Sequence, residues 1–236
     1  MGRRGAGRTA REPLARSPVT LLRVLLLAFD TSTPAVTVAV HDGTQVLAAR
    51  TVVDARRHGE LLAPGIARVL ADTSRSASDL TGIAVGVGPG PFTGLRIGLM
   101  TARAMGDALT IPVSGVCTLD VIAAAVVSAQ PFIVATDARR REVYWATYDA
   151  SGLRVDGPRV ERPADVEWQG PAYGAGALMY PDAFADARRP EFPDAGVLAT
   201  MVATGRAVVL TPDPLYLRRP DAVEPSPRRP VAAVTP

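Results

Sequence analysis

The most telling absences in this 236-residue chain are of lysine and asparagine, neither of which occurs. Without lysine the chain cannot form a Schiff base or place a Walker lysine against a phosphate. Without asparagine it has no acceptor for an Asn-linked glycan. Arginine therefore supplies all the permanent positive side-chain charge, and several classes of enzyme are excluded before any motif is considered.

Cysteine, histidine and long apolar runs are also scarce. Cys117 is the single cysteine, which excludes an internal disulfide and suits a reducing, cytoplasmic compartment. The two histidines, His41 and His58, belong to different predicted elements and do not have the spacing of a metal-binding pair. No apolar run reaches the ~18 residues of a membrane span, so we expect no membrane association.

The net charge of +3 is unevenly distributed along the chain. Residues 1–23 hold six arginines and one acid, and residues 218–236 hold four arginines and two acids. The segment between them, 24–217, has 16 arginines against 20 acidic residues, a net charge of −4. Because a surface that binds RNA unaided is usually basic, this segment argues against a stand-alone tRNA-binding module.

A glycine-rich segment, 86–98, stands between a predicted buried strand over 83–87 and a predicted helix over 93–109. Glycine permits positive φ and proline fixes the backbone, which predicts a stiff loop that leads into a helix N-terminus. Backbone N–H groups at such a terminus favour an anion. The segment lacks the lysine of a P-loop and the spacing of a dinucleotide fingerprint, so a structural turn remains the alternative. The weak anion or nucleotide candidates in it are Gly88, Gly90 and Thr93.

A second candidate lies near the start, where a predicted buried strand ends in Asp30 and a hydroxyl-rich turn, Thr31 to Thr33. Predicted strands over 36–40 and 45–53 follow. A carboxylate and a hydroxyl at a strand end could face a nucleotide, and we include Asp30 and Thr31 as weak candidates. The alternative is that Asp30 caps its own turn.

These motifs carry a family resemblance. The pairing of FDTST at 29–33 with GPGPFTGLRIG at 88–98 resembles the TsaB (YeaZ) family of the Gcp-like, actin-like ATPase superfamily. DARRREVYWA at 137–146 and PLYLRR at 214–219 are similar to the same family, so the resemblance covers roughly residues 24–219. It implies an α/β chain with a two-lobe actin-like (ASKHA, RNase H-like) fold whose second lobe is truncated.

The resemblance and the composition together predict four segments. They are a disordered Arg-rich extension over 1–23, an N-terminal actin-like lobe over 24–127, a smaller C-terminal lobe over 131–217 and a disordered Pro-rich tail over 220–236. Periodicity predicts further elements within the lobes. These are helices over 58–72, 118–127 and 196–204, and strands over 111–113, 131–137, 142–148 and 153–160.

The resemblance also bears on catalysis. TsaD, the catalytic paralogue, carries a His-x-x-x-His pair on the helix after the shared loop, and those positions fall here on Thr118 and Ile122. Neither side chain would hold a catalytic metal. Ser114 and Cys117 lie near them in the sequence but have no accompanying histidine for nucleophilic catalysis. We therefore expect no catalytic residue, no metal and no cofactor in this chain.

The function that the resemblance implies is that of a non-catalytic scaffold. Such a subunit binds and activates TsaD, which forms threonylcarbamoyladenosine next to the tRNA anticodon. A TsaE-like ATPase would join the complex, ATP could act within it, and tRNA would be bound only through it. The alternative is an ATP-dependent, kinase-like enzyme of the actin fold or a glycoprotease-type hydrolase. The absent histidine pair argues against the hydrolase, and the lack of a clear catalytic base argues against the kinase.

The predicted helix over 93–109 holds a small residue at every fourth position, which makes a flat stripe that another backbone can approach closely. Packing of the stripe on the chain's own sheet is the alternative. The resemblance implies that this helix and the helix over 58–72 pair with a second copy of the chain, or with TsaD. The predicted interface residues are Leu62, Ile66, Gly94, Leu95, Gly98, Leu99, Ala102, Met105 and Gly106.

One cluster has no assigned role. Arg139 to Arg141 stand at the turn of a predicted hairpin. They could bind phosphate, tRNA or an acidic partner, or they could form a solvated hairpin tip. The sequence leaves these alternatives open.

Overall fold

Strand β1 (Leu26–Asp30) lies at the centre of the first sheet in the computed structural model, which describes residues 24–218. It pairs antiparallel with β2 (Ala35–His41) and parallel with β4 (Gly82–Gly86). Strands β3 (Val46–Val53) and β5 (Val113–Val116) complete the order β3-β2-β1-β4-β5. The three inner strands are buried throughout, which explains their nearly continuous apolar sequence. Both predicted disordered segments lie outside the described residues.

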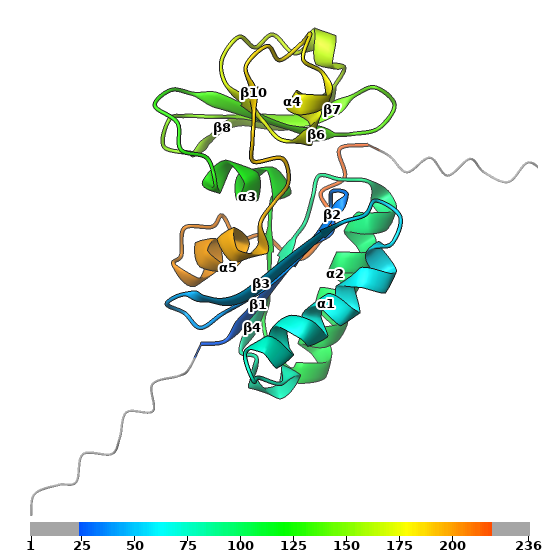
Figure 1. Ribbon diagram of the computed structural model, residues 1–236, viewed down its shortest axis with the longest axis vertical. Helices are drawn as coiled ribbons and strands as arrows, with labels where there is room; N and C mark the ends of the chain where they lie inside the picture. The colour runs from blue at the N-terminus through cyan, green and yellow to red at the C-terminus, as the bar shows by residue number, and fades with distance from the viewer. Residues whose placement is uncertain (1–23, 219–236) are drawn as a thin grey trace, which may run out of the picture.

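Helices cover both faces of this sheet (Figure 1). Helices α1 (His58–Asp72) and α2 (Phe92–Leu109) lie on one face, and α5 (Ala195–Ala203) lies on the other. Alternate residues of β1 serve the two sides, because Leu27 and Phe29 pack with α1 and α2 whereas Leu26 and Ala28 pack with α5. Among residues 24–218, none of the helices combines the length and apolar character that a membrane crossing requires.

The second sheet repeats the topology of the first. Its order is β8-β7-β6-β9-β10, with antiparallel pairing among the first three strands and parallel pairing from β6 to β10, as in β3-β2-β1-β4-β5. This confirms the predicted two-lobe α/β fold. The strands are β6 (Phe132–Asp137), β7 (Val143–Tyr148), β8 (Arg154–Glu161), β9 (Ala172–Tyr173) and β10 (Ala187–Arg188).

The helices of the second lobe are much shorter than those of the first. Between β8 and β9 the chain forms only the 3-residue 3-10 helix η2 (Pro163–Asp165), where the first lobe has the 15-residue α1. After β9 comes the 5-residue α4 (Ala175–Met179), where the first lobe has the 18-residue α2. The second lobe is therefore truncated in its helical layer, while its sheet keeps all five strands.

The last part of the predicted C-terminal lobe, 131–217, packs against the first lobe and not against the second. Helix α5 packs on the first sheet, where Leu198 lies beside Leu26 and the Ala195 N–H donates to Thr37 Oγ1 at 3.0 Å. Leu210 then forms a β-bridge with Gly115 of β5. The chain returns to the first lobe because the α5 side of that sheet is apolar and needs a cover.

Most of the predicted elements are confirmed, with differences at their ends. The predicted helix over 58–72 agrees with α1 at both ends. The strand predicted over 111–113 starts later, as β5, because Pro112 has no N–H to donate to a neighbouring strand. Helix α3 (Thr118–Ala124) ends before the predicted residue 127. The 3-10 helix η1 (Ala77–Asp79) was not predicted.

Candidate functional site

Asp30 and its turn pack directly into the glycine-rich loop. The Asp30 side chain is fully buried, and one oxygen, Oδ1, accepts the Ser32 N–H at 2.6 Å. The other oxygen, Oδ2, accepts the Thr118 hydroxyl at 2.7 Å. A Cβ placed on Gly86 would lie 1.9 Å from Oδ2, so only glycine fits opposite this carboxylate. Asp30 therefore caps its own turn, which was the alternative to a nucleotide role.

Burial dominates the electrostatics of Asp30. Loss of solvent raises the pKa of its carboxyl above the ordinary value of 3.8. The hydrogen bonds from Ser32 and Thr118 act in the opposite direction, because they stabilise the charged form. Thr118 thus serves as a hydrogen-bond donor to Asp30.

The Thr31 hydroxyl forms hydrogen bonds with two backbone groups of α2. Its Oγ1 donates to the Gly94 carbonyl at 2.7 Å and accepts the Gly98 N–H at 3.1 Å. These two backbone groups are four residues apart, so the hydroxyl bridges one turn of α2. A Cβ on Gly94 would lie 2.5 Å from the Thr31 carbonyl oxygen, and a Cβ on Gly98 would lie 2.5 Å from Oγ1. Both glycines are required because the turn approaches the helix so closely.

The small-residue stripe of α2 is therefore an internal packing surface. Gly106 belongs to it as well, because a Cβ there would lie 2.4 Å from a Val113 methyl group of β5. The prediction that the stripe and its neighbours form an intermolecular interface is wrong, because these residues are buried within the chain. Leu62, Ile66, Gly94, Leu95, Gly98, Leu99, Ala102 and Gly106 are buried, and the partly buried Met105 packs against the same core.

Gly88 and Gly90, the glycine candidates of the loop, contact other parts of the chain and not an open site. A Cβ on Gly90 would lie 2.1 Å from the Ser32 carbonyl oxygen, so the turn fills the hollow of the loop. The Gly88 N–H donates to Thr118 Oγ1 at 3.1 Å, and the Thr118 N–H donates to the Gly88 carbonyl at 2.7 Å. Of the loop candidates, only Thr93 is exposed. The residues present therefore do not fit a nucleotide phosphate chain at this loop.

The C-terminal strap, residues 210–218, closes the same region from outside. The Leu215 N–H donates to the Val87 carbonyl at 2.8 Å. Tyr216 stacks on Phe92, at the start of α2, with ring centroids 5.4 Å apart. The strap then reaches the second lobe, where Arg218 donates to the Ala138 carbonyl at 3.0 Å. Both lobes are thus tied together beside the loop.

His58 and Cys117 are buried and have structural partners. His58 Nε2 lies 2.7 Å from the Thr33 carbonyl oxygen, at the start of α1. Cys117 is fully buried, and burial raises the pKa of its thiol to about 12, which leaves it unreactive. Within residues 24–218, no group of three or more His, Cys, Asp or Glu side chains is placed to hold a metal ion.

Helices α1 and α2 lie side by side (Figure 1), and their exposed residues carry the features that sequence reasoning missed. Met100 of α2 is 58% exposed, the most exposed large apolar side chain on either helix. Both helices also expose alanines at helical spacing. The sequence signal that could have revealed this exposed surface is Met100 itself. It is an apolar residue two positions after Gly98, and therefore lies on the opposite side of the helix from the buried stripe. We define the outer face as Ala63, Ala67 and Ala71 of α1 with Arg96, Met100 and Ala104 of α2.

Comparison with known proteins gives concordant results. The family model described as "TsaD: tRNA N6-adenosine threonylcarbamoyltransferase" matches residues 47–222. An uncharacterised protein of Mycobacterium tuberculosis is 48% identical, over 84% of this chain and 93% of its own length. The "tRNA threonylcarbamoyladenosine biosynthesis protein TsaB" of Escherichia coli is 37% identical, over 54% of this chain and 57% of its own. The solved structure "YeaZ from Pseudomonas aeruginosa" superposes with a TM-score of 0.70 and 28% identity, covering 82% of this chain and 100% of that chain.

The contribution of the Thr31 hydroxyl to stability can be tested by replacing Thr31 with valine, which keeps the shape of the side chain. We expect Thr31→Val to lower the free energy of unfolding by about 1–3 kcal/mol, because the buried Gly98 N–H and Gly94 carbonyl lose their partner. Thr31→Ser keeps the hydroxyl and is the matched control. Urea denaturation of both variants measures the difference. Equal stability of the valine and serine variants would show that the hydroxyl is not needed there.

The raised pKa of the buried Asp30 carboxyl leads to a prediction for how the stability of the protein depends on pH. Since folding raises the pKa of Asp30, the native state binds more protons than the unfolded state between pH 3.8 and the raised value. The stability of the wild type relative to Asp30→Asn should therefore fall as pH rises through this window and stay constant above it. Urea unfolding of both proteins at stepped pH measures the difference.

Asp79 provides a control of opposite sign. Hydrogen bonds from Ser76 lower the pKa of this exposed carboxyl below 3.8. The stability of the wild type relative to Asp79→Asn should therefore rise with pH in the window just below 3.8. A relative stability for the Asp30 pair that also rises with pH would contradict the assignment.

Proposed function

This chain belongs to the TsaB (YeaZ) family of the Gcp-like superfamily, and from that membership we propose that it takes part in forming threonylcarbamoyladenosine in tRNA. The relatives named TsaB support this role, and the family model supports kinship with the transferase TsaD. The more specific proposal is that the chain is a scaffold subunit, which binds a TsaD-like partner and activates it.

The observation that carries the scaffold proposal is the closed turn at Asp30. Both carboxylate oxygens of Asp30 accept hydrogen bonds from the protein, and Ser32 fills the loop at Gly90. A kinase-like enzyme would need this carboxylate and loop to face a nucleotide and its metal ion. A glycoprotease-type hydrolase would need ligands at Thr118 and Ile122, which are buried and are not metal ligands. We accordingly propose no catalytic residue and no nucleotide cofactor at this loop.

The outer face of α1 and α2 is the surface that we assign to the partner. Its alanines allow a second pair of helices to approach closely, and Met100 supplies a flexible apolar side chain for the contact. One patch can serve a symmetric homodimer in the isolated chain and a TsaD-like partner in the complex, and the two states would exclude each other. A TsaE-like ATPase and ATP would enter at the level of the complex, as would tRNA.

Substitution of Met100 tests this assignment. We expect Met100→Asp to weaken both self-association and binding to the TsaD-like partner by at least tenfold, because it places an unpaired charge in an apolar contact. The fold should be retained, since Met100 is 58% exposed. Light scattering measures self-association, and calorimetric titration with the purified partner measures binding.

Val155 provides the matched control for Met100. It is 69% exposed on β8 of the second lobe, far in the sequence from both helices. Val155→Asp introduces the same charge at a similarly exposed apolar position and should leave both associations within twofold of the wild type. Equal weakening by the two variants would mean that net charge, and not the outer face, controls association.

The biological role has its own test. Cells depleted of this protein should lose threonylcarbamoyladenosine from bulk tRNA, which mass spectrometry of nucleosides measures. Restoring the wild-type chain should restore the modification, whereas Met100→Asp should restore much less of it. Unchanged modification after depletion, in cells with a single copy of the gene, would refute the proposed function itself.

A further inference from the structure

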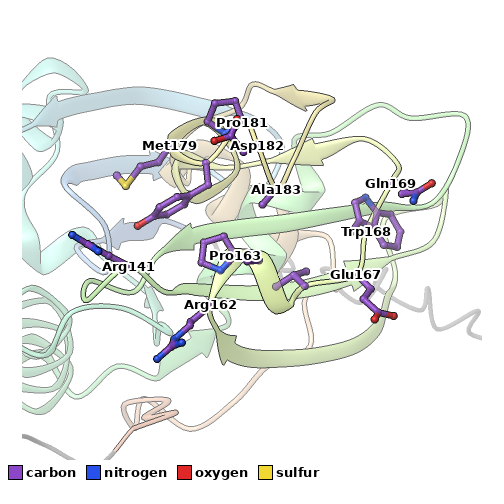
Figure 2. A pocket seen from close by; sticks show the side chains of 13 residues that line it. Arg141, Arg162, Pro163, Glu167, Trp168, Gln169, Met179, Pro181, Asp182 and Ala183 are labelled. Carbon is purple, nitrogen blue, oxygen red and sulfur yellow. The ribbon is translucent and has the colours of Figure 1, made fainter.

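The second lobe contains a large pocket that the proposed scaffold function does not use. It has a volume of about 910 Å³ and lies between η2 with the loop after it and residues 179–183, at the end of α4 (Figure 2). These segments stand where the first lobe has the long helices α1 and α2. The pocket thus occupies space that the shortened helical layer leaves open. Its volume is within the range of about 300–1,000 Å³ that is usual for small-molecule sites.

One end of the pocket is cationic. Arg141 and Arg162 line it, and Figure 2 shows both at the end opposite Trp168. Both residues are exposed, and neither guanidinium has a hydrogen bond or ion pair with any residue from 24 to 218. Two unpaired guanidinium groups at one end of a pocket are suited to a phosphate, which they can bind through several N–H groups.

The turn that carries Arg141 is held rigidly. Arg139, Arg140 and Arg141 have φ values of 60°, 56° and 61°, a left-handed conformation that L-residues rarely adopt in succession. Asp137 fixes the turn by accepting the Arg139 N–H at 2.8 Å and by pairing with its guanidinium at 3.3 Å.

The strap fixes the other side of the same turn. Arg218 forms an ion pair with Glu142 and donates to the Ala138 carbonyl at 3.0 Å. The Ala138 N–H also donates to the Glu142 carbonyl at 2.9 Å, which closes the turn. Arg141 is therefore presented at the pocket by a turn whose neighbouring charges are already satisfied.

The opposite end of the pocket is aromatic and rich in acceptors. The Trp168 indole N–H donates to the Pro171 carbonyl at 3.1 Å, and the ring packs against Gly170, where a Cβ would lie 3.2 Å away. Both contacts fix the ring. Glu167 and Gln169 flank it in the sequence and line the pocket at the same end. A fixed indole suits stacking with a planar base, and carboxylate and amide groups suit its amino and ring-nitrogen edge.

We propose that this pocket binds a nucleoside phosphate, with the phosphate at Arg141 and Arg162 and the base beside Trp168. A simple anion would use only the cationic end, and an uncharged aromatic molecule only the other end. The same chemistry is offered by a free nucleotide and by an unpaired nucleotide of an RNA strand. The site is distinct from the glycine-rich loop, and it does not depend on the outer face.

Titration of the full chain with adenosine monophosphate, and separately with a single-stranded riboadenylate hexamer, tests the proposal by calorimetry at fixed salt. We expect saturable binding of one ligand per chain. Arg141→Gln combined with Arg162→Gln should weaken it at least tenfold. The control is Arg188→Gln combined with Arg189→Gln, which removes the same charge from the same lobe outside the pocket. It should change binding by less than twofold.

The two titrations distinguish a free nucleotide from an RNA strand as the ligand. Binding of adenosine monophosphate supports a free-nucleotide site, and binding of the hexamer alone supports an RNA site. The proposal is overturned if neither ligand binds at millimolar concentration, or if the pocket and control variants lose affinity equally.

Recognition of the base needs its own measurement. Trp168→Leu should weaken binding at least tenfold, with a thermal melt to show that the variant is folded. Ribose 5-phosphate, which has no base, should bind the wild type at least tenfold more weakly than adenosine monophosphate, and this comparison needs no variant. Equal affinity for the two compounds would reduce the pocket to an anion site and refute the proposal.

Discussion

The hydroxyl of Thr31 is the contact on which the architecture of the first lobe depends. It is held between the Gly94 carbonyl and the Gly98 N–H, so the end of β1 is joined directly to the first turns of α2. That junction brings the Asp30 turn into the glycine-rich loop and leaves no room there for a phosphate chain. The same feature that orders the lobe thus closes the loop at which an actin-like ATPase would hold a phosphate chain.

Local pattern was sufficient to predict most helices and strands, because the first sheet and its covering helices have strong apolar periodicity. It was not sufficient to place the small-residue stripe. A residue such as Gly98 shows that some backbone or side chain approaches closely, but its spacing does not identify which one. The answer, Thr31, lies 67 residues away in sequence. The position of α5 was missed for a similar reason, since its apolar sequence fits either lobe and only the open face of the first sheet decides between them.

In the second lobe, as in the first, glycines allow the helix that follows a parallel strand to approach the central strand closely. A Cβ on Gly174, at the end of β9, would lie 2.2 Å from the Ala135 carbonyl oxygen of β6, and a Cβ on Gly176 would meet the Thr136 backbone at 2.8 Å. Asp137 caps the turn after β6 through the Arg139 N–H, as Asp30 caps the turn after β1. The two lobes therefore share strand order, capping carboxylate and glycine contact. Their main difference is the length of the helices that follow.

That difference in helix length explains how the two lobes can have separate roles. In the first lobe, long helices bury the sheet and present an outer face that holds exposed alanines and Met100, which is suited to protein contact. In the second lobe, short helices leave a pocket whose charged and aromatic ends suit a smaller ligand. Because the two surfaces share no residue and lie in different lobes, occupation of one does not sterically require the other to be empty. The two proposals are therefore compatible, one placing a protein partner on the outer face and the other a nucleoside phosphate in the pocket of the second lobe.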